Sequence, residues 1–124
     1  MPSYSFQKSK RLLNASDYKE VFDHNRVKVA NSSLLILAKP TLSRQSRLCL
    51  VIAKKNIPTA VQRNRVKRVV RETFRQRDFA VGMDIIFLAR SGAKLQSRKQ
   101  LTELLNNAWS SLDARSQQQR LKHA

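Results

Sequence analysis

Residues 47–75, RLCLVIAKKNIPTAVQRNRVKRVVRETFR, contain the change of pattern that decides the fold. The stretch begins with an apolar run at 47–54, which predicts a strand covered on both faces. The segment NIPT, which includes Pro58, then ends the strand. From residue 60 to about residue 77, apolar side chains recur at helical spacing. A strand followed at once by a helix predicts a βαβ unit if a second strand comes next.

Patterns on both sides of this stretch supply the remaining elements. Residues 83–90, MDIIFLAR, predict the strand that completes the βαβ unit, and residues 33–39, SLLILAK, predict another. A short additional strand fits residues 26–31. Helices are expected at 16–24 and, from a capping-box pattern and a leucine stripe, at about 97–112. The order α-β-β-(β)-α-β-α predicts an α+β fold, a single sheet of three to four strands with helices packed on it.

The length and the charge limit what the chain can be. Its 124 residues suit one domain, within which we expect residues 1–13 to form a basic arm and residues 115–124 a flexible tail. Lys and Arg number 25 against 8 Asp and Glu, which gives a net charge of +17. A small domain this cationic repels itself, so the charge indicates a polyanionic partner. Nucleic acid is favoured over an anionic membrane surface.

Other features argue for a cytoplasmic protein. Cys49 is the only cysteine, which excludes an internal disulfide and a thiolate metal site. No apolar run is long enough to span a membrane, and the N-terminal residues lack the apolar core of a signal peptide.

The predicted helix at 60–77 separates its apolar and cationic residues. On a helical wheel its apolar residues and one threonine fall within about 140°, and this arc must face the sheet. A second arc, of about 100°, carries Asn64, Lys67, Arg68, Arg71 and Arg75. A merely solvated face would mix both signs of charge, whereas only Glu72 lies near this arc. Because guanidinium groups match phosphate oxygens in pairs, the stripe indicates a folded nucleic acid.

The remaining candidate residues give weaker signals. Tyr18 and Phe22 lie four residues apart on one helix face and could stack on bases or belong to the core. The core is favoured for Phe22, and both interpretations stay open for Tyr18. His24 and His123 are interpreted as surface residues, and Cys49 as buried packing. No carboxylate pair, glycine-rich loop or metal-ligand cluster indicates catalysis by the chain itself.

Three segments together resemble the protein subunit of bacterial ribonuclease P. The segment KKNIPTAVQRNRVKRVVRETFR (54–75) carries that family's RNR signature, as RNRVKR. RLLNASDYKEVF (11–22) precedes it and MDIIFLAR (83–90) follows it, so the resemblance covers most of residues 10–110. One departure is the sequence Asn-Ile-Pro-Thr at 56–59, where many members have a glycine.

The resemblance implies the fold of the second domain of ribosomal protein S5, in which the βαβ crossover is left-handed. The general preference would have predicted a right-handed one. It also implies a protein cofactor of ribonuclease P, the ribonucleoprotein that endonucleolytically removes the 5′ leader from precursor tRNA. The RNA subunit then carries the chemistry and holds most of the Mg²⁺. The protein binds that RNA and the leader, improves substrate affinity and magnesium use, and is expected to be monomeric and away from membranes.

The resemblance also assigns roles to residues. The RNA-docking set is the helix stripe with its first turn: Arg63, Asn64, Arg65, Lys67, Arg68, Arg71 and Arg75. The set expected to line a cleft for the 5′ leader is Tyr18, Phe22, Val51, Ala53, Lys54 and Lys55. Arg63 and Arg65 fall outside the 100° stripe, but they could reach phosphate beside the helix N-terminus.

Two alternatives belong to other classes of protein. A structural ribosomal protein would share the charge and the fold, but it would not affect precursor cleavage. A nonspecific nucleic-acid-binding protein would bind duplex DNA at least as well as structured RNA. A nuclease made of protein alone is disfavoured, because it would need clustered carboxylates.

Overall fold

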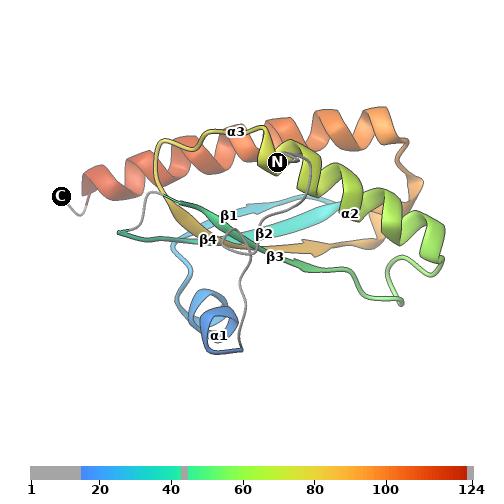
Figure 1. Cartoon of the computed structure of the whole chain (residues 1–124), viewed down its shortest axis with the longest axis horizontal. Coiled ribbons are helices and arrows are strands. Elements are labelled where there is room, and N and C mark those ends of the chain that lie inside the picture. Colours follow the sequence, from blue (N-terminus) through green and yellow to red (C-terminus); the bar gives the residue numbers. More distant parts are fainter. Residues whose placement is uncertain (1–14, 43–44, 123–124) are drawn as a thin grey trace, which may run out of the picture.

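A four-stranded sheet separates the helices of the computed structural model into two layers (Figure 1). The structure describes residues 15–42 and 45–122, so the predicted basic arm and the last two residues lie outside the described part. The elements in chain order are α1 (Ala15–His24), β1 (Val27–Ala30), β2 (Leu34–Pro40), β3 (Arg47–Val51), α2 (Ala60–Arg75), β4 (Met83–Ala89), the 3₁₀ helix η2 (Ser91–Leu95) and α3 (Arg98–Lys122). Helices α2 and α3 lie on one face of the sheet and α1 on the other. The α+β class and the optional fourth strand are therefore confirmed.

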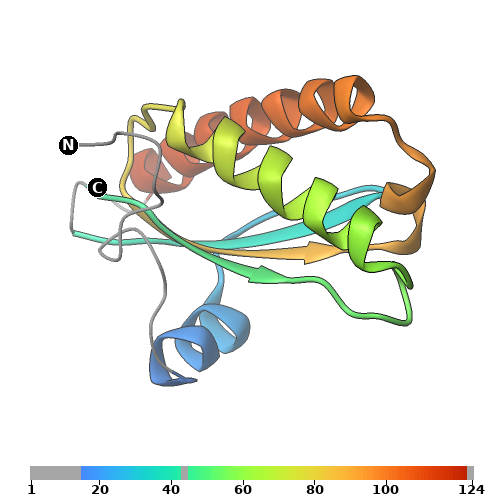
Figure 2. The ribbon, with the colours of Figure 1, turned by 45° about the vertical axis from the view of Figure 1, so that its right-hand side comes forward.

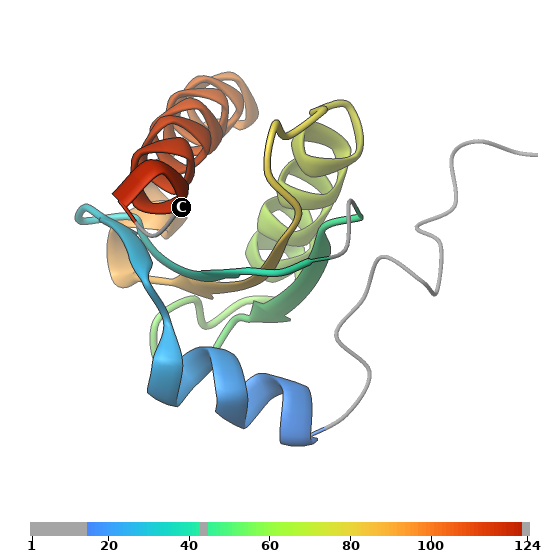
Figure 3. The same ribbon diagram turned by 90° about the vertical axis from the view of Figure 1, so that its left-hand side faces the viewer.

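The sheet has the order β1-β2-β4-β3, with only the β3–β4 pair parallel. These two strands and α2 form the predicted βαβ unit. In Figure 3 both strands run away from the viewer, with β3 to the right of β4 and α2 above them. The chain passes counter-clockwise from β3 through α2 to β4, which is the left-handed crossover that general statistics disfavour.

The main core fills the space between the sheet and the two long helices. Alternate residues of the strands point to it, among them Ile36, Leu48, Ile85 and Phe87, each no more than 3% exposed. Helix α2 buries the arc predicted from the helical wheel: Val66, Val69, Val70, Thr73 and Phe74. The apolar stripe predicted for α3 is buried except for Leu104, which is only half-buried. Its buried members are Leu101, Leu105, Ala108, Trp109 and Leu112. Figure 2 shows α2 and α3 side by side over the sheet.

A polar contact inside this core joins α2 to α3. The Trp109 indole Nε1–H donates to Thr73 Oγ1 at 2.9 Å, and both residues are buried. The Thr73 hydroxyl lies 2.8 Å from the Val69 carbonyl oxygen, one turn earlier in α2. Phe74 and Phe79 pack around the indole, with ring centroids 5.7 and 5.9 Å from that of Trp109. Thr73 therefore satisfies the one polar atom of the largest side chain in the core.

Three expectations about the ends of elements were wrong. The helix α3 continues to Lys122, so the described part of the predicted flexible tail is helical. The buried Ser116, which donates to Met83 Sδ, extends the packed face of α3 beyond Leu112. Strand β3 stops at Val51 because a turn begins there, in which the Asn56 and Ile57 N–H groups both donate to the Ala53 carbonyl. The helix α2 ends at Arg75 rather than near residue 77.

Thr73→Val should lower the free energy of unfolding by about 1–3 kcal/mol, because it leaves the buried Trp109 N–H without an acceptor while keeping the side-chain volume. Urea unfolding followed by tryptophan fluorescence measures the loss. Thr102→Val is the matched control, since the Thr102 hydroxyl donates to the Arg98 carbonyl at an exposed position. Equal effects of the two substitutions would contradict the role given to the indole contact.

Candidate nucleic-acid interface

The cationic stripe of α2 points away from the core because the opposite side of the helix is buried. Thr59 caps the helix, its Oγ1 accepting from the Gln62 N–H at 3.2 Å, and this fixes where the first turn begins. Asn64, Arg65, Arg68 and Arg71 are exposed, and Lys67 and Arg75 are half-buried. The structure therefore places the whole predicted RNA-docking set on one helix. All of its side chains except that of Arg63 point away from the core without a described role in the fold of the turn before α2.

Arg63 differs from the rest of that set. Its Nη1 donates to the carbonyl oxygens of Ile57 and Pro58, at 3.0 and 2.8 Å. Ile57 is fully buried beneath this contact. Arg63 therefore secures the turn that leads into α2, a role that the sequence did not indicate. A contact between Arg63 and RNA remains a prediction.

Carboxylates are almost absent from the cationic stripe. No described residue forms a hydrogen bond or ion pair with the side chains of Arg65, Lys67, Arg68 or Arg71. On α2 itself Glu72 pairs with Arg98, at 3.3 Å. Other carboxylates form ion pairs elsewhere in the fold: Glu20 with Lys39, Asp17 and Asp84 with Arg47, and Asp113 with Arg77. The segregation leaves these four cations without a carboxylate partner among the described residues.

The sheet face that carries α1 lies opposite α2. On this face the side chains of β2, β4 and β3 form three rows across the strands. One row is apolar and half-exposed, and consists of Leu35, Leu88 and Val51. The next row is apolar and more deeply covered, and consists of Leu37, Ile86 and Cys49. The third row is charged, and consists of Lys39, Asp84 and Arg47. Val21 of α1 packs in the same cluster as the middle row and is fully buried.

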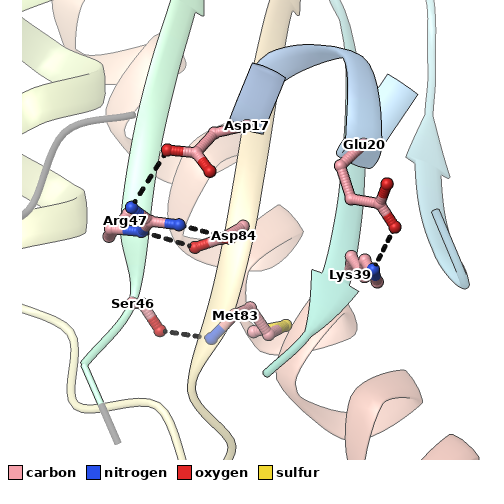
Figure 4. A network of polar contacts seen from close by, with 7 residues as sticks. All are labelled: Asp17, Glu20, Lys39, Ser46, Arg47, Met83 and Asp84. Carbon is pink, nitrogen blue, oxygen red and sulfur yellow. Dashed lines mark hydrogen bonds and ion pairs between the residues drawn. The ribbon is translucent and has the colours of Figure 1, made fainter. Parts of the chain in front are cut away.

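The charged row holds α1 in place by pairing with two carboxylates of that helix, Asp17 and Glu20 (Figure 4). Arg47 donates from Nε and Nη2 to the two carboxylate oxygens of Asp84, at 2.8 and 2.7 Å, and from Nη1 to Asp17 at 3.2 Å. The hydrogen bond with Asp84 raises the pKa of the Arg47 guanidinium. Lys39 Nζ lies 2.5 Å from Glu20 and lowers the pKa of that carboxyl, so acid weakens this contact. Both contacts tie α1 to the third row, and the first row stays partly exposed.

Tyr18 and Phe22 lie on α1 beside the apolar rows. Their rings are stacked, with centroids 5.9 Å apart and planes inclined by 16°. Tyr18 packs against the apolar cluster under α1. Phe22 is 50% exposed, so the expectation that it belongs to the core was wrong. Phe22 lies near the end of a short helix of 10 residues, beside the partly buried Tyr18 ring, so little of the fold covers it.

The other residues expected to bind the leader follow β3 toward its carboxyl end. Val51 belongs to the half-exposed apolar row. Ala53, Lys54 and Lys55 lie in the turn after the strand, and both lysines are exposed. Figures 1 and 2 show this turn beyond the end of β3, away from α1. The predicted set is therefore divided between α1, the end of β3 and the turn after it, rather than gathered at one point.

Some residues at these surfaces were missed from the sequence. Leu35 and Leu88 complete the half-exposed row, and Cys49, expected as buried packing, is only partly covered. Burial raises the pKa of the Cys49 thiol. The alternation of side chains along β3 could have indicated Cys49, because residues 49 and 51 lie on the same face of the strand. Leu35 and Leu88 join them only through the register of the sheet.

Residues 15–42 and 45–122 contain no group of three or more His, Cys, Asp or Glu placed to hold a metal ion. Within the same residues no helix is both long and apolar enough to cross a membrane.

Comparison with known proteins identifies the family. The sequence model described as Ribonuclease P matches residues 6–113. The chain belongs to the ribonuclease P protein family. The ribonuclease P protein component of Marinomonas sp. is 42% identical over 113 residues, which cover 90% of this chain and 86% of that protein. The component from Marinobacter nauticus is 43% identical over 109 residues, covering 88% and 83%. A structure of the Staphylococcus aureus RNase P protein superposes with a TM-score of 0.72 at 25% identity, covering 85% of this chain and 99% of that one.

Membership of the ribonuclease P protein family confirms the function expected from the sequence. The chain is the protein subunit of a ribonucleoprotein enzyme that acts in tRNA 5′ processing, and its partner is the ribonuclease P RNA. The family and the shared fold decide against a structural ribosomal protein and a nonspecific nucleic-acid-binding protein.

Arg47→Ala should lower the free energy of unfolding by about 1–3 kcal/mol, because it leaves the carboxylate of Asp84, which is 9% exposed, without its charged partner. Asp17→Asn keeps the Arg47–Asp84 pair and should cost no more than about 1 kcal/mol. Urea unfolding of both variants measures the difference. Hydrogen exchange of the α1 amides should accelerate in both variants, and unchanged exchange would mean that Arg47 does not hold α1.

Proposed function

We propose that the two sides of the molecule bind two different RNAs. The cationic stripe of α2 docks on the catalytic RNA, and the sheet face beside α1 receives the single-stranded 5′ leader of precursor tRNA. The observation that carries the proposal is the segregation of charge, because Arg65, Arg68 and Arg71 have no side-chain partner among the described residues. Asp17, Glu20, Asp84 and Asp113 form their ion pairs elsewhere in the fold. Guanidinium groups without such partners keep their full attraction for closely spaced phosphates.

The second surface has the chemistry of a single strand. Half-exposed aliphatic side chains and the Phe22 ring offer flat apolar area on which bases can stack, since every base has a π face. Lys54 and Lys55, at the far end of β3, are placed to attract the phosphates of the same strand. A leader lying along β3 would contact the apolar row first and the lysines afterwards. Contact with bases through stacking tolerates sequence variation, which suits leaders of different sequence.

The remaining details of the assembly follow from this division. The substrate is precursor tRNA, and the Mg²⁺ that the reaction uses is held mainly by the RNA subunit, because the chain offers no carboxylate cluster among its described residues. The protein binds the RNA as a monomer and works in the cytoplasm beside its RNA partners. The cations of α2 lower the repulsion between two RNAs and in this way reduce the magnesium concentration that the complex needs.

Reconstitution tests the function directly. The purified chain is mixed with a bacterial ribonuclease P RNA and a precursor tRNA at low magnesium, and release of the leader is followed. Leader release should increase with added protein and should require the RNA. Cleavage by the protein alone, or no stimulation by protein shown to be folded, would contradict the proposal.

Replacing both Arg68 and Arg71 with Ala should weaken binding to the catalytic RNA and reduce the slope of log K against log salt concentration by about 2, since two phosphate contacts are lost. Both residues are exposed, so the fold should be kept. Filter binding between 50 and 200 mM salt measures the slope. Arg26→Ala with Arg90→Ala removes two exposed arginines outside α2 and serves as the charge-matched control. Identical slopes for the two double variants would exclude the stripe as the docking surface.

Phe22→Ala should weaken binding of a precursor with a 5′ leader to the holoenzyme by about 1–3 kcal/mol, the range measured for one stacked base, and should leave mature tRNA binding unchanged. Leu95→Ala is the control, because Leu95 is a 78% exposed apolar residue on η2. Equal losses for both tRNAs would mean that Phe22 supports the fold. A second readout is alkylation of Cys49, which a bound leader should slow if it covers the apolar rows.

A further inference from the structure

A hollow of about 340 Å³ opens between the first half of α2 and the start of α3. Its walls are formed by Val61, Asn64, Arg65, Arg68 and Arg98. The first four residues come from α2, and Arg98 is the first residue of α3. Three arginines from two helices therefore line one concavity. This arrangement requires the packing of α3 against α2, which brings residues about 30 positions apart in the chain to the same site.

The charge balance of the hollow favours an anion. Arg65 and Arg68 have no side-chain partner among the described residues. Arg98 is paired with Glu72, whose two carboxylate oxygens lie 3.5 and 3.3 Å from its Nη2. Three cations and one carboxylate leave the hollow with an excess of positive charge. Guanidinium forks fit the oxygens of a phosphate group better than ammonium groups do.

The other walls suit the parts of a nucleotide beside its phosphate. The amide of the exposed Asn64 can donate and accept hydrogen bonds, as base edges and ribose hydroxyls require. Val61 is 70% exposed and supplies an apolar part of the wall.

We infer that this hollow binds one phosphate group of the catalytic RNA, and that Arg98 is an RNA-binding residue outside the RNR helix. The inference rests on the proposed docking of α2 on the catalytic RNA and extends that surface to α3. Arginines from two helices can hold a phosphate from two sides, whereas a stripe along one helix leaves it free to slide. The hollow would therefore set the register of α2 on the RNA.

The ion pair between Arg98 and Glu72 keeps this arginine at the rim before RNA arrives. The two side chains are 59% and 37% exposed, so their attraction is largely screened by water. When Arg98 leaves Glu72 and binds a phosphate with both of its terminal nitrogens, little binding energy is therefore lost. Glu72 thus orients Arg98 without blocking the hollow.

The test measures the affinity of the full-length chain for ribonuclease P RNA between 50 and 200 mM salt. Arg98→Ala should weaken binding by about 5- to 10-fold at physiological salt and reduce the salt slope by about 1, as expected for one phosphate contact. Lys99→Ala is the matched control, because Lys99 is an exposed cation on the next residue of α3 and does not line the hollow. Thermal unfolding of both variants should match that of the parent chain.

A double-variant cycle shows whether the arginines share one ligand. Arg98→Ala combined with Arg68→Ala should weaken binding by less than the product of the two single losses, because both side chains lose the same phosphate. Arg98→Ala combined with Arg71→Ala should be multiplicative, since Arg71 does not line the hollow.

The outcomes separate this inference from the function on which it rests. Equal small effects of Arg98→Ala and Lys99→Ala, with a clear loss for Arg68→Ala, would overturn the hollow as a phosphate site and leave the docking of α2 intact. No loss for Arg68→Ala or Arg71→Ala would overturn both. Multiplicative losses for Arg98 and Arg68 would show two separate contacts and would also overturn the shared site.

Discussion

Burial of the apolar arc of α2 against the sheet is the constraint on which the molecule depends. Each valine or phenylalanine of the arc contributes about 1.5–3 kcal/mol when it leaves water. Repulsion between like charges four residues apart on the same helix costs only about 0.2–0.5 kcal/mol per pair. Burial therefore outweighs repulsion and fixes the rotation of the helix about its axis. Because the cations cannot follow the apolar side chains into the core, the same burial turns them outward.

The carboxylates of the chain have a complementary role. Asp17, Glu20 and Asp84 pair with Arg47 and Lys39 on the face opposite α2, where they hold α1 over one part of the sheet. Placing negative charge there removes it from the surface that meets RNA. One set of ion pairs thereby positions the aromatic residues of α1, and the row of Leu35, Leu88 and Val51 stays partly exposed. Structural and electrostatic requirements are met by the same few side chains.

Sequence patterns predicted local structure where one period dominated. The 3.6-residue period of α2 gave both its buried arc and its cationic stripe, and the apolar runs gave the strands of the βαβ unit. Element ends were less accurate, because they depend on contacts that the period does not contain. The turn that ends β3 is set by hydrogen bonds to Ala53, and α3 continues past Leu112 because Ser116 is buried against Met83. Phe22 was misjudged for a related reason, since an aromatic residue on an amphipathic helix is buried only if a partner lies above it.

The sequence by itself determined the fold class, the outward direction of the α2 stripe and, through its resemblance to the ribonuclease P protein, the function. These properties follow from charge and from spacing within single helices and strands, which a linear pattern records. Only the tertiary structure decided which residues from different elements meet. The row of Leu35, Leu88 and Val51 exists through strand register, the hold on α1 through Arg47 reaching two elements, and the arginine hollow through α3 packing beside α2. Contacts between residues of different elements depend on long-range packing, and a local sequence pattern does not contain the geometry of that packing.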